Sequence, residues 1–138
     1  MKLKEITNII EQWAPLNWAE DFDNVGLLVG DSSSIVNKAI ITIDTLENVI
    51  EEAIENNCDL IISFHPIIFD GLKKVNNKNY VERVIAKAIK NNINIYSIHT
   101  NLDNHPEGVN FQISKYLELN KTKILIPVSY THLRAHET

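Results

Sequence analysis

Two apolar runs decide the fold that this sequence predicts: Cys58-Asp-Leu-Ile-Ile-Ser63 and Ile93-Asn-Ile-Tyr-Ser-Ile98. Each has the length and composition of a buried strand, and an amphipathic stretch over residues 80–89 predicts a helix between them. Consecutive parallel strands joined by a helix end on the same side of a sheet. His65 and Asp103, which follow the two runs, are therefore expected at one end of the sheet, where open α/β folds place their sites.

The rest of the chain predicts further helices and strands around this unit. Asp44 and Glu47 have the spacing of a capping box, which predicts that a helix begins there. A loop is expected over residues 99–107. The chain is therefore interpreted as an α/β protein with a mixed, largely parallel sheet flanked by helices. The other expected elements are helices over residues 3–13, 46–54 and 109–117, and strands over 26–30, 39–43 and 123–126.

Composition limits the classes of function. At 138 residues with 44% hydrophobic residues, the chain is expected to form one domain with a real core. A net charge of −5 argues against a nucleic-acid or anionic membrane surface. The single cysteine, Cys58, excludes an intrachain disulfide and favours a cytoplasmic setting. We expect no signal peptide and no membrane span.

His65 and Asp103 carry the side chains that a divalent transition metal accepts, and we interpret both as metal ligands. Simpler roles are a loop-capping histidine for His65 and an Asx turn for Asp103. His99 is the candidate catalytic residue, which would orient a ligand or relay a proton, although a strand-terminal histidine often only bonds to backbone. Asp44 is explained by helix capping and could also face the site. His105 is expected to be solvated.

Three segments resemble the Nif3-like family, also called the dinuclear-metal-centre or GTP cyclohydrolase 1 type 2 family. The first combines Trp13-Ala-Pro15 with Phe22-Asp-Asn-Val-Gly-Leu-Leu-Val-Gly30. The second is Ile43-Asp44 followed by Asp59-Leu-Ile-Ile-Ser63 and His65-Pro66-Ile-Ile-Phe69. The third is Ile98-His-Thr-Asn-Leu-Asp103 with Gly108-Val-Asn110. Their order and spacing make the resemblance specific over residues 1–127.

The resemblance implies one lobe of a two-lobed subunit, a toroidal homohexamer and a two-metal centre in each subunit. His65 matches the second histidine of the family's His-His-Pro motif, and Asp103 matches its ligating aspartate. Phe64 stands where the first histidine is expected, and the family's C-terminal histidine and glutamate have no counterpart here. We therefore expect zinc, manganese or iron as the cofactor, with two ions per subunit in the family and one here if Phe64 closes an apolar wall.

Residues 128–138 are interpreted as a non-native tail that follows a truncated domain of residues 1–127. His132 and His136 have helical spacing, but the tail does not resemble the family at that point. We expect no role for this tail in metal binding.

Three functions remain open at this stage. The first is a metal-dependent hydrolase with a small-molecule substrate; the family's nominal substrate is GTP, although a shared fold does not identify the substrate. The second is a non-catalytic metal-binding scaffold whose ring presents a surface to a partner, which the substitution at Phe64 favours. The third is a Rossmann-like binding module without metal. The chain itself is expected to be inactive.

Overall fold

The computed structural model describes residues 1–124, which form an α/β fold around a four-stranded sheet. The strands are β1 (Gly26–Val29), β2 (Ala39–Thr42), β3 (Leu60–Ser63) and β4 (Asn94–Ser97), in the order β1-β4-β3-β2. β2, β3 and β4 are parallel, and β1 is antiparallel to β4. The predicted fold class, a mixed and largely parallel sheet, is confirmed.

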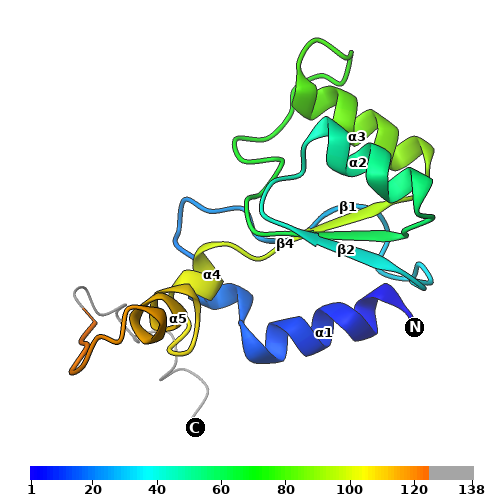
Figure 1. Ribbon diagram of the computed structural model, residues 1–138. Coiled ribbons are helices and arrows are strands. Elements are labelled where there is room, and N and C mark those ends of the chain that lie inside the picture. The colour runs from blue at the N-terminus through cyan, green and yellow to red at the C-terminus, as the bar shows by residue number, and fades with distance from the viewer. Residues whose placement is uncertain (125–138) are drawn as a thin grey trace, which may run out of the picture.

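Helices cover both faces of the sheet, as Figure 1 shows. α2 (Glu47–Glu55) and α3 (Tyr80–Lys90) pack on one face, and α1 (Leu3–Trp13) packs on the other. Alternation along the central strands explains these layers, because successive side chains of a strand point to opposite faces. Ile61 and Ile95 belong to the core cluster beneath α2 and α3, whereas their neighbours Leu60 and Tyr96 pack in the cluster against α1.

Three short helical elements gather at one end of the sheet: the 3₁₀ helix η1 (Leu16–Trp18), α4 (Thr100–Asp103) and α5 (Val109–Tyr116). α4 is a single turn inside the segment that was expected to be a loop. Asn101, which is fully buried, explains why the turn forms. Its Oδ1 accepts a hydrogen bond from the backbone of His99, and its Nδ2 donates to the carbonyl of Ala14.

The expected capping box at Asp44 is wrong. α2 begins at Glu47 with Leu46 at its N-cap position, and no side chain caps it. Asp44 lies before the cap, and its carboxylate contacts His65 instead.

Two other expectations concern the C-terminal end of the chain. The predicted strand over residues 123–126 extends beyond the described residues, and residues 123 and 124 are not part of a strand. The tail over residues 128–138 lies outside the described residues.

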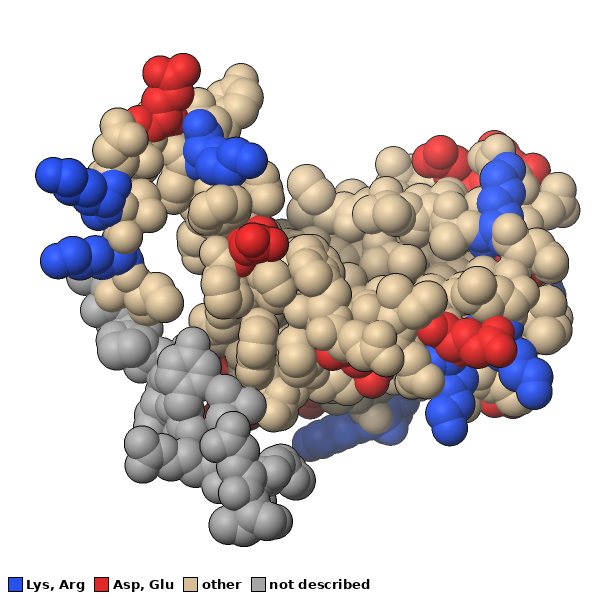
Figure 2. All heavy atoms as spheres, turned by 90° about the horizontal axis from the view of Figure 1, so that it is seen from below, with Lys and Arg blue, Asp and Glu red and all other residues tan. Residues whose placement is uncertain are grey.

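Charged groups are interleaved on the face drawn in Figure 2, where Lys and Arg alternate with Asp and Glu around broad uncharged areas. No continuous basic surface is visible on this face. Among the helices of residues 1–124, none is long and apolar enough to cross a membrane.

Candidate metal-binding site

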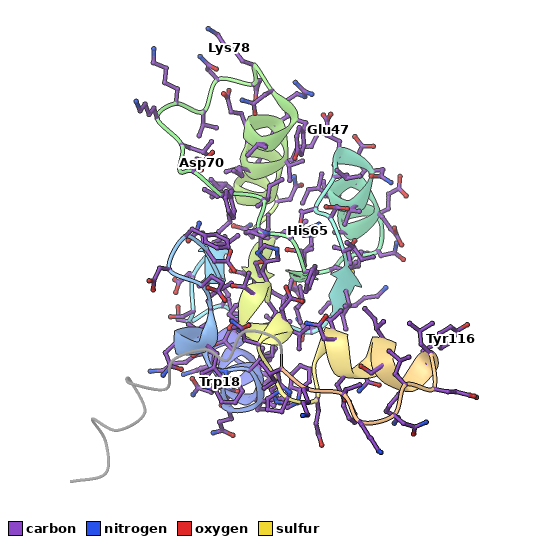
Figure 3. All side chains as sticks on the ribbon, turned by 90° about the vertical axis from the view of Figure 1, so that its left-hand side faces the viewer. Trp18, Glu47, His65, Asp70, Lys78 and Tyr116 are labelled. Carbon is purple, nitrogen blue, oxygen red and sulfur yellow. The ribbon has the colours of Figure 1, made fainter. Side chains whose placement is uncertain are left out.

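Strand register brings the candidate site together. Thr42 pairs with Ser63, and Ser63 pairs with Ser97, so the three parallel strands end level with one another. Two positions beyond these partners stand Asp44, His65 and His99, which therefore lie side by side at the carboxyl end of the sheet. The imidazole centroids of His65 and His99 are 5.5 Å apart, with their planes at 80°. Figure 3 shows His65 beside the ends of the strands.

Asp103 completes this group from the last position of α4. Burial raises the pKa of its carboxyl, His99 lowers it, Asp23 raises it and His65 lowers it, with a net rise. Asp103 lies one helical turn after His99, whose carbonyl oxygen accepts a hydrogen bond from the Asp103 backbone at 3.2 Å. The structure therefore places His65 and His99 side by side, with Asp103 one helical turn beyond His99.

Each imidazole has its own carboxylate partner. Nδ1 of His65 lies 2.7 Å from Oδ1 of Asp44, and both side chains are about half exposed, at 50% and 51%. Nδ1 of His99 lies 2.9 Å from Oδ1 of Asp23, but here the aspartate side chain is 0% exposed and the imidazole 19%. The two pairs thus share one geometry and differ sharply in burial.

Asp23 is held by donors on both carboxylate oxygens. Oδ1 accepts hydrogen bonds from the Asn24 backbone at 2.8 Å and faces His99, while Oδ2 accepts from the Thr100 backbone at 3.0 Å and from the Thr100 hydroxyl. Burial raises the pKa of Asp23, but the hydrogen bonds from Thr100, His99 and Asn24 outweigh it, and the net pKa is lowered. Asp23 is therefore ionised at neutral pH.

Sequence reasoning did not single out Asp23. It lies just before β1, and its partner His99 is far along the chain, just after β4. The antiparallel pairing of Gly26 with Ser97 places these two flanking segments next to each other. The only signal for Asp23 in the sequence was its membership of the Phe22–Gly30 segment that carries the family resemblance.

Phe64 packs against both imidazoles. Its ring centroid is 5.1 Å from that of His65 and 5.2 Å from that of His99. An aromatic ring offers no donor atom to a metal, so this side of the site is apolar.

The donors fit a divalent ion in kind but not in number. Imidazole nitrogen and carboxylate oxygen suit zinc, manganese and iron. However, residues 1–124 contain no group of three or more His, Cys, Asp or Glu side chains arranged to hold an ion. The described residues therefore supply part of a coordination sphere, and a complete sphere needs donors from elsewhere.

His105 was expected to be solvated, and this was wrong. Its ring is half-buried and packs between the indoles of Trp13 and Trp18, with centroids 5.0 and 5.6 Å away. Its Nδ1 accepts a hydrogen bond from the backbone of Glu107 at 2.9 Å. Aromatic stacking explains His105 without a role in the site.

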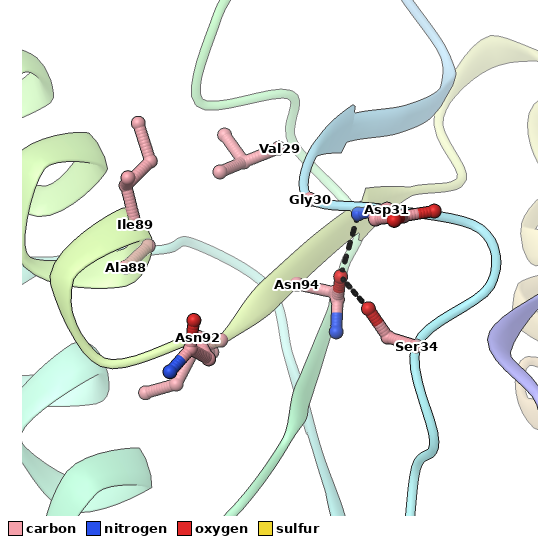
Figure 4. A pocket seen from close by; sticks show the side chains of 9 residues that line it. Val29, Gly30, Asp31, Ser34, Ala88, Ile89, Asn92 and Asn94 are labelled. Atoms are coloured by element: carbon pink, nitrogen blue, oxygen red, sulfur yellow. Dashed lines mark hydrogen bonds between the residues drawn. The ribbon is translucent and has the colours of Figure 1, made fainter.

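A separate hollow of about 200 Å³ lies at the opposite end of the sheet, beside the first residue of β4 (Figure 4). Its wall is largely apolar, with Val29 and Ile89 among the lining residues. Asn94, at its floor, makes side-chain hydrogen bonds to Asp31, Ser34 and Asp59. No histidine lines this hollow, and we assign it a packing role.

Comparison with known proteins agrees with this architecture. A family model described as Duf34/NIF3 (NGG1p interacting factor 3) matches residues 1–136. The chain belongs to the Duf34/NIF3 family. The resemblance recognised in the sequence motifs is thereby confirmed.

Relatives within the Duf34/NIF3 family are longer than this chain. A GTP cyclohydrolase 1 type 2 homolog from Clostridium acetobutylicum is 45% identical over 125 residues, which cover 91% of this chain and 47% of the relative. A homolog of the same name from Clostridium perfringens is 42% identical, covering 91% of this chain and 48% of the relative. The chain thus spans about half the length of these curated relatives.

A solved structure supports the same fold. The Bacillus cereus protein related to NIF3 superposes with a TM-score of 0.87 at 35% identity, covering 93% of this chain and 35% of that one.

Proposed function

We propose that this Duf34/NIF3 chain carries part of a divalent-metal site, and that the complete protein is a metal-dependent hydrolase. The observation that supports this most directly is the pair of imidazoles, side by side at the carboxyl end of the parallel strands, with Asp103 one helical turn beyond His99. The names of the relatives, which include GTP cyclohydrolase 1 type 2 homologs, favour a hydrolytic reaction.

His65 and Asp103 would hold the ion, and His99 would orient a ligand or move a proton at its Nε2 atom. A divalent ion in such a site polarises an electrophilic oxygen and activates water for attack. Phe64 excludes water from one side of the imidazoles. The remaining donors would come from chain outside the described residues or from a second copy.

Titration of the 138-residue chain with Zn²⁺ by calorimetry tests the metal-binding part. His65→Gln and Asp103→Asn are expected to weaken binding at least about tenfold, because each removes a direct ligand. His105→Gln and Asp70→Asn are matched controls, since His105 packs between two indoles and Asp70 lies in an exposed loop. Equal affinities for all four variants would disprove the assignment of the ligands.

The proposed hydrolase activity is tested on the full-length protein that contains these residues. We expect metal-dependent turnover of GTP or of a generic phosphodiester that His65→Gln abolishes while the fold is retained. Lack of turnover of either substrate by a folded, metal-loaded protein would reject the hydrolase.

A non-catalytic metal-binding scaffold is the second candidate. Phe64 favours it, because a phenyl ring, which offers no metal ligand, packs against both imidazoles. Retained metal binding and self-association without turnover would support the scaffold over the enzyme.

A further inference from the structure

Each of the two imidazoles is held at Nδ1 by a carboxylate and makes no hydrogen bond at Nε2 within residues 1–124. We propose that Asp23 and Asp44 are positioning residues that fix His99 and His65 as Nδ1–H tautomers, which leaves the Nε2 lone pair of each ring free to accept a ligand or a proton. The use of the His65 lone pair by a divalent ion, and of the His99 lone pair in orienting a ligand or moving a proton, rests on the proposed function. The tautomers themselves do not depend on it.

The chemistry of the partners determines where the proton lies. An ionised carboxylate only accepts hydrogen bonds, so an imidazole nitrogen within 2.9 Å of it must carry a proton. In a neutral imidazole the other nitrogen then has a free lone pair. A ring nitrogen that binds a metal needs that lone pair, and ligating histidines commonly donate their other N–H to a carboxylate.

Asp23 is the stronger of the two positioning residues. Its oxygens accept hydrogen bonds from the Asn24 backbone and from the backbone and hydroxyl of Thr100, and these donors favour the ionised carboxylate that His99 Nδ1 faces. Thr100 is anchored in turn, because its hydroxyl accepts a hydrogen bond from the Glu20 backbone at 2.9 Å. The Asp23–His99 pair is thus built into the junction between α4 and the segment that precedes β1.

Asp44 makes the same contact from a half-exposed position. Its carboxylate has His65 as its only side-chain partner among the described residues. Water competes for both groups at this exposure, so we expect a weaker preference for the Nδ1–H tautomer at His65 than at His99. Asp44 can also be replaced with little effect on packing, which makes it the cleaner variant.

Long-range ¹⁵N–¹H NMR of the full chain, labelled at histidine nitrogens, measures these tautomers directly. At pH 8, His65 and His99 are expected to carry their ring proton on Nδ1. His105 is an internal reference with the opposite tautomer. Its Nδ1 accepts a hydrogen bond from the Glu107 backbone, so its proton must lie on Nε2.

Asp44→Ala is expected to move the His65 proton towards Nε2 without changing the tautomer of His99. Asp23→Ala is expected to move the His99 proton towards Nε2 without changing the tautomer of His65. Asp21→Ala, which removes a nearby exposed carboxylate, should change neither. If Asp23→Ala does not fold, Asp44→Ala and the wild-type spectrum still decide the question. Nε2–H forms of His65 and His99 in the wild type, or an unchanged His65 tautomer in Asp44→Ala, would overturn the proposal.

Zn²⁺ titration of the same variants separates this inference from the proposed function. We expect affinity to fall roughly 10- to 100-fold in Asp44→Ala, in the range found when such outer partners are removed. If the tautomers behave as expected but no form of the chain binds Zn²⁺, the positioning role stands and metal binding fails. If Zn²⁺ binds equally well to wild type and Asp44→Ala, the positioning role towards the ion is refuted.

Discussion

Gly30→Ala is expected to lower the free energy of unfolding by about 3–5 kcal/mol. Backbone strain and the loss of the hydrogen bonds made by the buried side-chain amide of Asn94 both contribute. Gly30 has φ +118°, and a Cβ there would stand 2.0 Å from Oδ1 and 2.7 Å from Cγ of Asn94. Neither distance can be tolerated, so the Asn94 side chain must move. The close approach visible in Figure 4 is therefore what requires glycine at this position.

The size of the effect follows from what Asn94 would lose. Its Oδ1 accepts from the Asp31 backbone at 3.0 Å and from the Ser34 hydroxyl at 3.4 Å, and its Nδ2 donates to the Asp59 carbonyl at 2.9 Å. Each such bond contributes about 1 kcal/mol, and the positive φ adds about 1–2 kcal/mol for a residue with a Cβ. Asn94 is almost fully buried, so water cannot replace these partners.

Gly71→Ala is the matched control. Gly71 has φ +78°, but a Cβ there meets nothing within 4 Å, so only the strain of about 1–2 kcal/mol remains. Urea unfolding followed by the fluorescence of Trp13 and Trp18 measures both variants under the same conditions. Equal destabilisation of the two variants, within about 0.5 kcal/mol, would refute the argument that the Asn94 contact sets the cost.

Three further outcomes are expected. Tyr96→Phe should lose about 1–2 kcal/mol in urea unfolding, because the buried Tyr96 hydroxyl donates to Glu11 Oε1 at 3.0 Å; no loss would mean that water replaces this bond. Backbone hydrogen bonds from the preceding loop lower the pKa of Glu82, so its stabilisation is present at neutral pH and is lost as pH falls through this lowered pKa. Glu82→Gln should therefore flatten the acid dependence of stability, unlike the exposed Glu52→Gln, and identical acid profiles would contradict this. Deleting residues 129–138 should leave Zn²⁺ affinity unchanged, and a large drop would assign ligands to the tail.

Much of the fold was predictable because local patterns and packing agree. The helix over Tyr80–Lys90 and the strands on either side of it follow from periodicity, and their parallel order follows from the helical connection. α4 was missed because its single turn depends on the buried amide of Asn101, whose partner Ala14 is distant in the chain. A turn held by tertiary contacts leaves no periodic signal.

The candidate site was predictable only in part. His65 and Asp103 stood out because they follow strands that run in the same direction. The capping role of Asp44 was wrong, because its carboxylate contacts His65 from the end of the neighbouring strand; this contact agrees with the alternative that Asp44 faces the candidate site. Asp23 was missed because only the antiparallel pairing of β1 with β4 brings it to His99.

The sequence by itself determined the order of the main helices and strands, the layered α/β architecture and the presence of an imidazole and a carboxylate at the ends of parallel strands. It could do so because helix and strand periods are local, and because right-handed connections bring strand ends to one side. Only the tertiary structure decided which aspartate holds which histidine, and where Phe64 and His105 pack. Those contacts depend on strand register and on close approach between distant segments, which no local pattern encodes.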